Sequence, residues 1–423
     1  MSHRELKEVE ERLPKAHLVG ICKQHEEEAK EKSMAELKLL VKTMGLEAVS
    51  INVQKRDKIN KALYTGRGFI EKVVENMEEG DVLVYDNSLQ PSQIRNIHKK
   101  FGKDILDRTE VILEIFQQHA RSKEARIQVD LARYEYELPR LRKLWAHLDK
   151  ERGTSGTGAT SRGSGEKQLE LDRRYIGQKI SKARGDLRKI ASQKQVQRQY
   201  RFSHFKKVCI VGYTNAGKST LFNALTDGSV LVEDKLFATL ESTSKSLNLG
   251  KGKDIIISDT VGFISQLPHH LVASFRATLQ EVIDADLLLH VVDITDSENR
   301  THIADVEKVL AEIEADEIPA MLVFNKIDLL DDDLQENIAA KYPDAILISS
   351  VEKLNLDILL AEVDRKLNIA HVVKILVPHL EQKTISHLFK LGVVLEKEYR
   401  EDGVLLDVLL NDEDVKKFKQ WKI

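Results

Sequence analysis

Residues 208–219 read Val-Cys-Ile-Val-Gly-Tyr-Thr-Asn-Ala-Gly-Lys-Ser and continue into Thr-Leu-Phe-Asn-Ala-Leu. The first four residues form an apolar run that is typical of a strand buried in a parallel sheet. The next eight match the pattern G-x-x-x-x-G-K-S, which joins a strand to a helix. Its glycines let backbone N–H groups surround phosphate oxygens at a helix N-terminus, where the helix dipole favours an anion. The stretch therefore predicts an α/β domain built around a phosphate-binding loop.

The polar residues of this loop have distinct expected roles. Lys218 is expected to reach the β- and γ-phosphates of a nucleotide, and the Ser219 hydroxyl is expected to coordinate Mg²⁺. Asn215 has two readings: it helps hold K⁺ near the phosphates and takes part in catalysis, or it only stabilises the loop. The whole loop is expected to contact the nucleotide, through Gly212, Tyr213, Thr214, Asn215, Ala216, Gly217, Lys218, Ser219 and Thr220.

A second motif follows the apolar run at residues 255–257. It reads Asp259-Thr-Val-Gly262. Asp259 is expected to bind Mg²⁺, directly or through a water, and the Gly262 amide is expected to sense the γ-phosphate during catalysis. Thr239 lies between the two motifs, where a switch threonine would reach the metal. The expected metal ligands are therefore Ser219, Thr239 and Asp259.

A third motif, Asn325-Lys326-Ile-Asp328, follows the predicted strand 320–324. The Asp328 carboxylate can accept two hydrogen bonds, from N1–H and the 2-amino group of guanine. Adenine offers no such pair of donors, so the carboxylate discriminates between the two bases. The three motifs in this order predict a guanine-nucleotide site.

Phe263 stands directly after Asp259-Thr-Val-Gly262, at a position where a glutamine often orients the attacking water. A phenylalanine cannot hydrogen-bond a water. Hydrolysis is therefore expected to be slow alone and to need an outside group or a bound partner.

Outside this core, 423 residues with 42% hydrophobic and 31% charged residues predict several globular domains. We expect an N-terminal α/β domain (residues 1–135), a basic helical hairpin (136–205), a P-loop domain (206–370) and a small C-terminal α/β domain (371–423). In the first domain, Ser33 is a plausible N-cap for a helix ending near Gly45. Two cysteines exclude a disulfide framework, and the chain is expected to be cytoplasmic, without a membrane segment, and monomeric.

The hairpin follows from a seven-residue apolar period on both sides of a Gly/Ser-rich loop, residues 153–165. The apolar positions are Ile127, Leu131, Tyr134, Leu138, Leu141, Trp145 and Leu148 before the loop, and Ile176, Ile180, Ala183, Leu187 and Ile190 after it. Pro139 is expected to kink the first arm or to start a new helix. Residues 140–207 hold 19 Lys/Arg against 6 Asp/Glu, whereas the whole chain has a net charge of −3. This concentration fits either a polyanionic partner or a solvated helix face.

These motifs resemble the HflX family of translational GTPases. The resemblance rests on the P-loop stretch, on Leu236-Phe-Ala-Thr-Leu, on Asp259-Thr-Val-Gly-Phe-Ile and on Leu267-Pro-His. Upstream it rests on Leu89-Gln-Pro-Ser-Gln-Ile-Arg-Asn96, on Asp107-Arg-Thr, on Leu138-Pro-Arg-Leu and on Arg162-Gly-Ser-Gly-Glu. It implies binding to the large ribosomal subunit and its RNA, and splitting or rescue of stalled or idle ribosomes. The hairpin loop would point at the peptidyl-transferase region.

Two departures from the family pattern stand out. Ser164 replaces the proline of the family's Gly-Pro-Gly-Glu loop. The guanine-supporting S-A-K motif appears as Ser349-Ser350-Val351, where position 350 acts mainly through its backbone N–H. The resemblance thus adds Ser349 and Ser350 to the nucleotide contacts. Two alternatives to ribosome splitting remain: a GTPase of ribosome assembly, and a largely non-catalytic RNA-binding protein gated by GTP.

Overall fold

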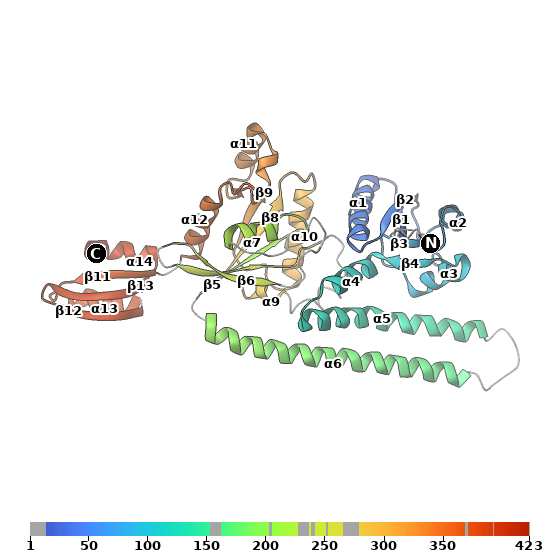
Figure 1. Cartoon of the computed structure of the whole chain (residues 1–423), viewed down its shortest axis with the longest axis horizontal. Coiled ribbons are helices and arrows are strands. Elements are labelled where there is room, and N and C mark those ends of the chain that lie inside the picture. Colours follow the sequence, from blue (N-terminus) through green and yellow to red (C-terminus); the bar gives the residue numbers. More distant parts are fainter. Residues whose placement is uncertain are drawn as a thin grey trace, which may run out of the picture. The chain divides into compact units, whose positions relative to one another are not determined.

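The computed structural model describes residues 14–152, 162–202, 205–226, 237, 242–250, 253–264, 279–368, 371–391 and 393–422. The chain divides into two compact units, the first mainly residues 1–193 and the second containing residues 278–423. Each unit is described by itself below, with the labels of Figure 1.

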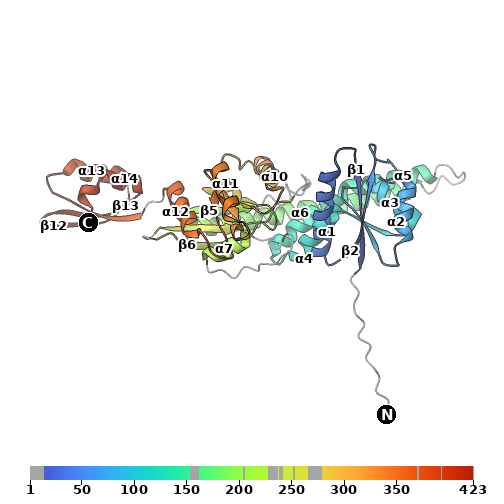
Figure 2. The same ribbon diagram turned by 90° about the horizontal axis from the view of Figure 1, so that it is seen from above.

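The N-terminal sheet has four parallel strands in the order β2-β1-β3-β4. Its elements are β1 (Lys15–Cys22), α1 (Glu27–Thr43), β2 (Glu47–Lys55), α2 (Arg67–Glu75), β3 (Val82–Tyr85), α3 (Pro91–Phe101), β4 (Asp104–Asp107) and α4 (Arg108–His119). Figure 2 shows α1 and α4 on one side of the sheet and α2 and α3 on the other. Because helices cover both faces, the central strand β1 is apolar and buried along most of its length.

Local signals explain where several of these helices begin and end. Helix α3 starts with Pro91, whose missing N–H costs nothing there, and it ends before Gly102 in a left-handed conformation. Asp107 caps α4 by accepting a hydrogen bond from the Glu110 N–H, while the Glu110 side chain accepts one from the Asp107 N–H. The strand β4 and the helix α4 therefore meet at a well-defined corner.

The hairpin consists of α5 (Lys123–Arg152) and α6 (Arg162–Phe202). Between the two helices, Leu131, Ile180 and Ala183 form a buried cluster. Around it pack five further residues with the expected spacing: Ile127, Tyr134, Leu138, Ile176 and Leu187. This part of the predicted apolar seam is confirmed; the side chains of Leu141, Trp145 and Leu148 lie outside those that the structure describes.

The sheet of the second unit has the order β10-β9-β8-β5-β7-β6, with β6 alone antiparallel among the described strands. Its elements are β5 (Lys206–Gly212), α7 (Lys218–Thr226), β6 (Thr243–Asn248), β7 (Asp254–Asp259), α9 (Gln280–Ile283), β8 (Leu287–Asp293), α10 (Asn299–Glu312), β9 (Ala320–Asn325), η1 (Ile327–Leu329), α11 (Asp332–Lys341), β10 (Ile346–Leu347) and α12 (Leu356–Leu367). In such a sheet, ligands bind at the carboxyl ends of the parallel strands.

The C-terminal segment forms an antiparallel sheet in the order β11-β13-β12 with its own apolar core. Its elements are β11 (His371–Val377), α13 (Gln382–Leu391), β12 (Val393–Arg400), β13 (Gly403–Leu410), α14 (Asp412–Lys417) and η2 (Lys419–Trp421). The multidomain α/β class expected from the sequence is confirmed. In the described part of the chain, every helix is too short or too polar to cross a membrane.

Two local predictions are wrong, and one of the two outcomes expected at Pro139, a new helix, is excluded. Ser33 is no N-cap, because α1 begins at Glu27 and the buried Ser33 hydroxyl donates to Asp86. No new helix starts at Pro139, because α5 continues through it, with Leu138 packed against α6 and Arg140 ion-paired on either side. Residues 162–165 were expected in the Gly/Ser-rich loop but belong to α6. The helix formed by the residues that follow them extends back over these four positions, because adding residues to an existing helix is favourable.

Candidate functional site

The predicted phosphate-binding loop runs from the end of β5 to the start of α7. Two of its glycines are required by space as well as by backbone angle. A Cβ on Gly212 (φ 150°) would lie 2.2 Å from the Val291 carbonyl oxygen, and one on Gly217 (φ 90°) would lie 2.2 Å from Nδ2 of Asn325. Any other residue would therefore clash at both positions. Because glycine has no side chain, the backbone of the loop can adopt this conformation and its N–H groups stay accessible to a ligand.

Lys218 is buried at the first position of α7, and its Nζ donates to the Tyr213 carbonyl oxygen at 2.6 Å. Burial lowers the pKa of Lys218 to about 8, against the opposing effect of Asp259. A Cβ on Gly262 would lie 3.0 Å from the same Nζ, so the second motif passes directly beside the amine. The amine therefore places a buried positive charge between the first two motifs.

Ser219 and Asp259 form the oxygen-rich part of the site. The Ser219 hydroxyl donates to Oδ2 of Asp259 at 2.6 Å, and Asp259 is fully buried at the end of β7. A hydroxyl and a carboxylate are oxygen ligands, which a small hard cation such as Mg²⁺ prefers. The donor set therefore fits the expected metal.

Asn325, at the end of β9, connects three parts of the site. Its Nδ2 donates to the Ala216 carbonyl oxygen at 2.9 Å. Its Oδ1 accepts hydrogen bonds from the N–H of Ser350 at 3.0 Å and from the Ser350 hydroxyl at 2.9 Å. One buried amide thus ties the phosphate-binding loop to the loop of Ser349 and Ser350, both of which are buried.

The remainder of the third motif follows Asn325 directly: Lys326 precedes η1, and Asp328 lies in it. Lys326 has a left-handed backbone (φ 70°), and its Nζ donates to Asp293 at 2.5 Å. Asp328 follows and is exposed to solvent. The Asp328 carboxylate is therefore accessible to a nucleobase, while Asn325 and Lys326 before it are held by hydrogen bonds.

Phe263 is attached to the phosphate-binding loop through its backbone. Its N–H donates to the Gly212 carbonyl at 3.1 Å, and its carbonyl accepts from the Thr214 N–H at 2.7 Å. The ring is 4% exposed. A side chain at this position is therefore turned into the protein, which explains how an apolar residue is accommodated there.

Two histidines beside the loop were not singled out from the sequence. His290 on β8 is buried, and burial followed by the positive charge of Lys218 lowers its pKa to about 4. It is therefore neutral near pH 7 and adds no charge to that of Lys218. The ring of His302 on α10 stacks on Tyr213 at 3.7 Å, with an interplanar angle of 10°. Neither contact has a local sequence signal, because each joins residues far apart in the chain.

The structure brings the three predicted motifs together at the carboxyl ends of β5, β7 and β9. The residues placed there are Gly212, Tyr213, Thr214, Asn215, Ala216, Gly217, Lys218, Ser219, Thr220, Asp259, Gly262, Asn325, Lys326, Asp328, Ser349 and Ser350. Thr239 lies outside the described residues. Among the residues that the structure describes, no group of three or more His, Cys, Asp or Glu is placed to hold a metal.

Three family models match consecutive parts of the chain. Residues 31–117 match a model described as GTP-binding GTPase N-terminal, and residues 119–201 match GTP-binding GTPase Middle Region. Residues 207–326, which contain the three motifs, match a model described as 50S ribosome-binding GTPase.

Two relatives that match most of the chain agree with these models. The GTPase HflX of Caldanaerobacter subterraneus is 43% identical over 395 residues, covering 92% of this chain and 89% of the relative. The GTPase HflX of Escherichia coli is 40% identical, covering 71% and 70%. A GTP-binding protein from Sulfolobus solfataricus, solved with GDP, is 27% identical with a TM-score of 0.43 and covers 83% and 98%. Its site is assembled from the residues that the sequence singles out, and the two GTPase HflX relatives are at least 40% identical and match it over at least 70% of their length. The chain belongs to the HflX family of GTPases.

Proposed function

We propose that this GTP hydrolase is a Mg²⁺-dependent switch that binds the large ribosomal subunit in its GTP form and splits or rescues stalled or idle ribosomes. In this proposal Lys218 and the loop amides hold the phosphates, Ser219, Thr239 and Asp259 hold Mg²⁺, and Asp328 reads guanine. K⁺ held near Asn215 adds positive charge beside the phosphates and takes part in catalysis. Hydrolysis then releases the ribosome.

The observation that carries the ribosomal part is the solvent face of α6. Opposite the seam, a stripe with alternating spacings of four and three residues contains Leu171, Tyr175, Gln178, Lys182, Gly185 and Lys189. Leu171 and Tyr175 are 47% and 58% exposed, and both lysines are exposed. We call this set the α6 stripe. It combines apolar surface with positive charge, as surfaces that bind RNA do.

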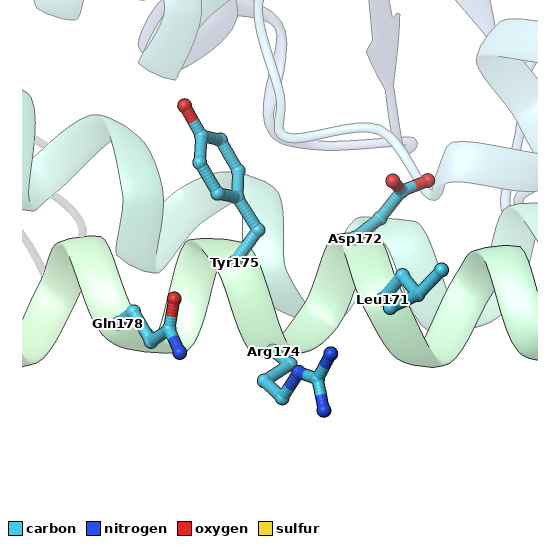
Figure 3. Close-up of a pocket in the computed structure, with 5 residues that line it drawn as sticks. All are labelled: Leu171, Asp172, Arg174, Tyr175 and Gln178. Carbon is cyan, nitrogen blue, oxygen red and sulfur yellow. The ribbon is translucent and has the colours of Figure 1, made fainter.

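Lys179, which lies beside the α6 stripe on the same helix, contacts the aromatic residue of the stripe. Nζ of Lys179 lies 4.6 Å from the ring centroid of Tyr175 and 5.1 Å from that of Tyr134 on α5. Figure 3 shows Tyr175 and Arg174 pointing away from each other around the shallow depression that they line with Leu171, Asp172 and Gln178. A tyrosine ordered in this way can stack on a nucleobase. The family model that matches residues 207–326 is described as 50S ribosome-binding GTPase, which supports the same partner.

The proposal is tested by measuring steady-state GTP hydrolysis while purified large ribosomal subunits are titrated in. We expect saturable stimulation of about tenfold or more, and an apparent affinity that falls steeply with salt because phosphate contacts release counterions. Lys182→Glu combined with Lys189→Glu should weaken the apparent affinity at least about tenfold without changing the rate measured without ribosomes. The matched control is Lys38→Glu with Lys42→Glu, the same charge change on α1. A flat rate with wild-type protein contradicts the ribosomal part.

A second prediction concerns Phe263→Gln. Because position 263 is buried and fixed to the loop backbone, we expect the glutamine not to accelerate hydrolysis. It should instead lower the free energy of unfolding by about 3 kcal/mol, through lost packing and a buried amide. Single-turnover hydrolysis and urea denaturation measure the two effects. A several-fold faster rate without ribosomes would show that the side chain reaches the attacking water.

A further inference from the structure

The corner between β4 and α4 contains a buried carboxylate. Asp107 is completely buried and accepts hydrogen bonds from the N–H of Leu89 at 3.0 Å, from the N–H of Glu110 at 3.0 Å and from the Tyr136 hydroxyl at 2.8 Å. Tyr136 belongs to α5, the first arm of the hairpin. The corner of the N-terminal sheet is therefore bonded to the hairpin through a charged group.

Arg140, one turn further along α5, completes this arrangement. Its Nη2 donates to Oδ2 of Asp107 at 2.6 Å, and its Nη1 donates to Oε1 of Glu110 at 3.0 Å. The guanidinium lies 3.5 Å from the ring centroid of Tyr136, and the side chain is only 14% exposed. We call Asp107, Glu110, Tyr136 and Arg140 the Arg140 clamp.

The geometry of the clamp fixes the orientation of the Arg140 guanidinium as well as its distance from the two carboxylates. A planar guanidinium that bridges two carboxylates and stacks on a ring is held in one orientation, which a single ammonium would not be. Arg140 also follows Pro139 directly, where α5 lacks an internal N–H donor. The clamp therefore holds the helix where its own hydrogen bonding is weakest.

The clamp holds α5 at a point from which a further part of the helix projects. Helix α5 extends beyond Arg140 to Arg152, about 18 Å at the rise of an α-helix. A tilt of about ten degrees at Arg140 would therefore displace the far end by roughly 3 Å. The described seam joins α6 to α5 through Ile127, Leu131, Tyr134 and Leu138, all of which precede Arg140. The part of α6 that precedes the seam, which includes Leu171 of the α6 stripe, would therefore move with the far end of α5.

We propose that Arg140 is a positioning residue that fixes the direction in which the hairpin leaves the N-terminal sheet, and that productive ribosome contact depends on this direction. The inference rests on the proposed ribosomal function for its second half only. Arg140 touches no residue of the nucleotide site among its described contacts, so the rate of GTP hydrolysis without ribosomes should not depend on it.

The charges around the clamp predict what removal of Arg140 does. Burial and the neighbouring Asp107 raise the pKa of Glu110 to about 7, while Arg140 and Arg133 oppose the rise. Without Arg140, two carboxylates repel each other in a buried corner, and Glu110 takes up a proton more readily. Tyr136 and two backbone N–H groups still bind Asp107, so we expect the corner to loosen rather than the domain to unfold.

The test measures hairpin direction directly, by electron spin resonance distances between labels at Glu75→Cys on α2 and Glu170→Cys on α6, an exposed position that precedes the seam. Arg140→Met, which keeps an apolar stem, should broaden the distance distribution, and Arg140→Lys should broaden it less. The matched control is Arg133→Met on the same helix, which removes the more exposed contacts of Arg133 with Glu114 and Gln117 on α4 and should leave the distribution narrow. Should Arg140→Met not fold, Arg140→Lys carries the same measurement.

Ribosome-stimulated hydrolysis is then measured on the same variants. For Arg140→Met we expect the stimulation by large subunits to fall at least tenfold, with the rate without ribosomes within twofold of wild type. Adding Glu110→Gln to Arg140→Met should restore the stability towards urea. It should restore neither the narrow distance distribution nor the stimulation by large subunits, so the double variant separates an effect on positioning from an effect on stability.

Two results overturn the inference: an unchanged distance distribution in Arg140→Met, or a broadened one with full stimulation. Absence of stimulation in the wild type contradicts the proposed ribosomal function and with it the second half of the inference. The distances still decide whether Arg140 sets the direction of the hairpin.

Discussion

Lys218→Ala is expected to reduce GTP hydrolysis by about 10²–10³-fold or more, down to the limit of detection. The amine is buried between the first two motifs, next to Gly262 and 2.6 Å from the Tyr213 carbonyl oxygen. Phosphate charges entering this space interact with it in a medium of low dielectric constant, where a fixed positive charge is worth far more than in water. An alanine leaves the loop amides in place but removes that charge from the transition state.

Single-turnover hydrolysis and the affinity for a fluorescent GTP analogue separate chemistry from binding in this variant. The matched control is Lys308→Ala, an exposed lysine on α10. Ser219→Ala should behave like Lys218→Ala but be partly restored by high Mg²⁺. If Lys218→Ala retained full turnover, the assignment of the phosphate-binding loop would be wrong.

Asp328→Asn is expected to exchange the preference for GTP for a preference for xanthosine triphosphate. The carboxylate accepts from two donors of guanine, whereas xanthine presents a carbonyl in place of the amino group. An asparagine amide can donate to that carbonyl, and it would leave a guanine donor unpaired. We expect the ratio of the two affinities to change by a factor of about 10⁴.

Competition between the two nucleotides for the same protein measures this ratio. Asp331→Asn serves as the control, because it removes an exposed carboxylate from the same loop region. Unchanged selectivity in Asp328→Asn would mean that another residue reads the base, although the third motif would still be tied to the loop through Asn325.

The parts of the fold that could be predicted from sequence are those specified by neighbouring residues. The apolar run at residues 208–211 lies within the strand β5, because buried parallel strands need apolar side chains on both faces. Glycine spacing and strand context were enough to locate the phosphate-binding loop. Each of these signals lies within a few residues of the feature it determines.

Features that depend on distant residues could not be predicted in this way. Ser33 looks like a helix cap, but its partner Asp86 lies directly after β3, more than 50 residues along the chain, with Lys30 and Arg108 also bound to it. Pro139 normally ends a helix, yet its neighbours pack and pair on both sides. His290 is a single polar residue in an apolar strand, and its proximity to Lys218 exists only after folding. Long-range contacts override local preference in each case.

The single amide of Asn325 has a consequence for how the sequence can diverge. Gly217 has no room for a side chain because Asn325 occupies that space, and Asn325 is oriented by Ser350. We therefore expect the effects of substitutions at these three positions on nucleotide affinity to be non-additive. The 133 positions between the first and the last do not make them independent, because all three act through one amide. The residue that the sequence tolerates at one of them is expected to depend on the residues at the other two.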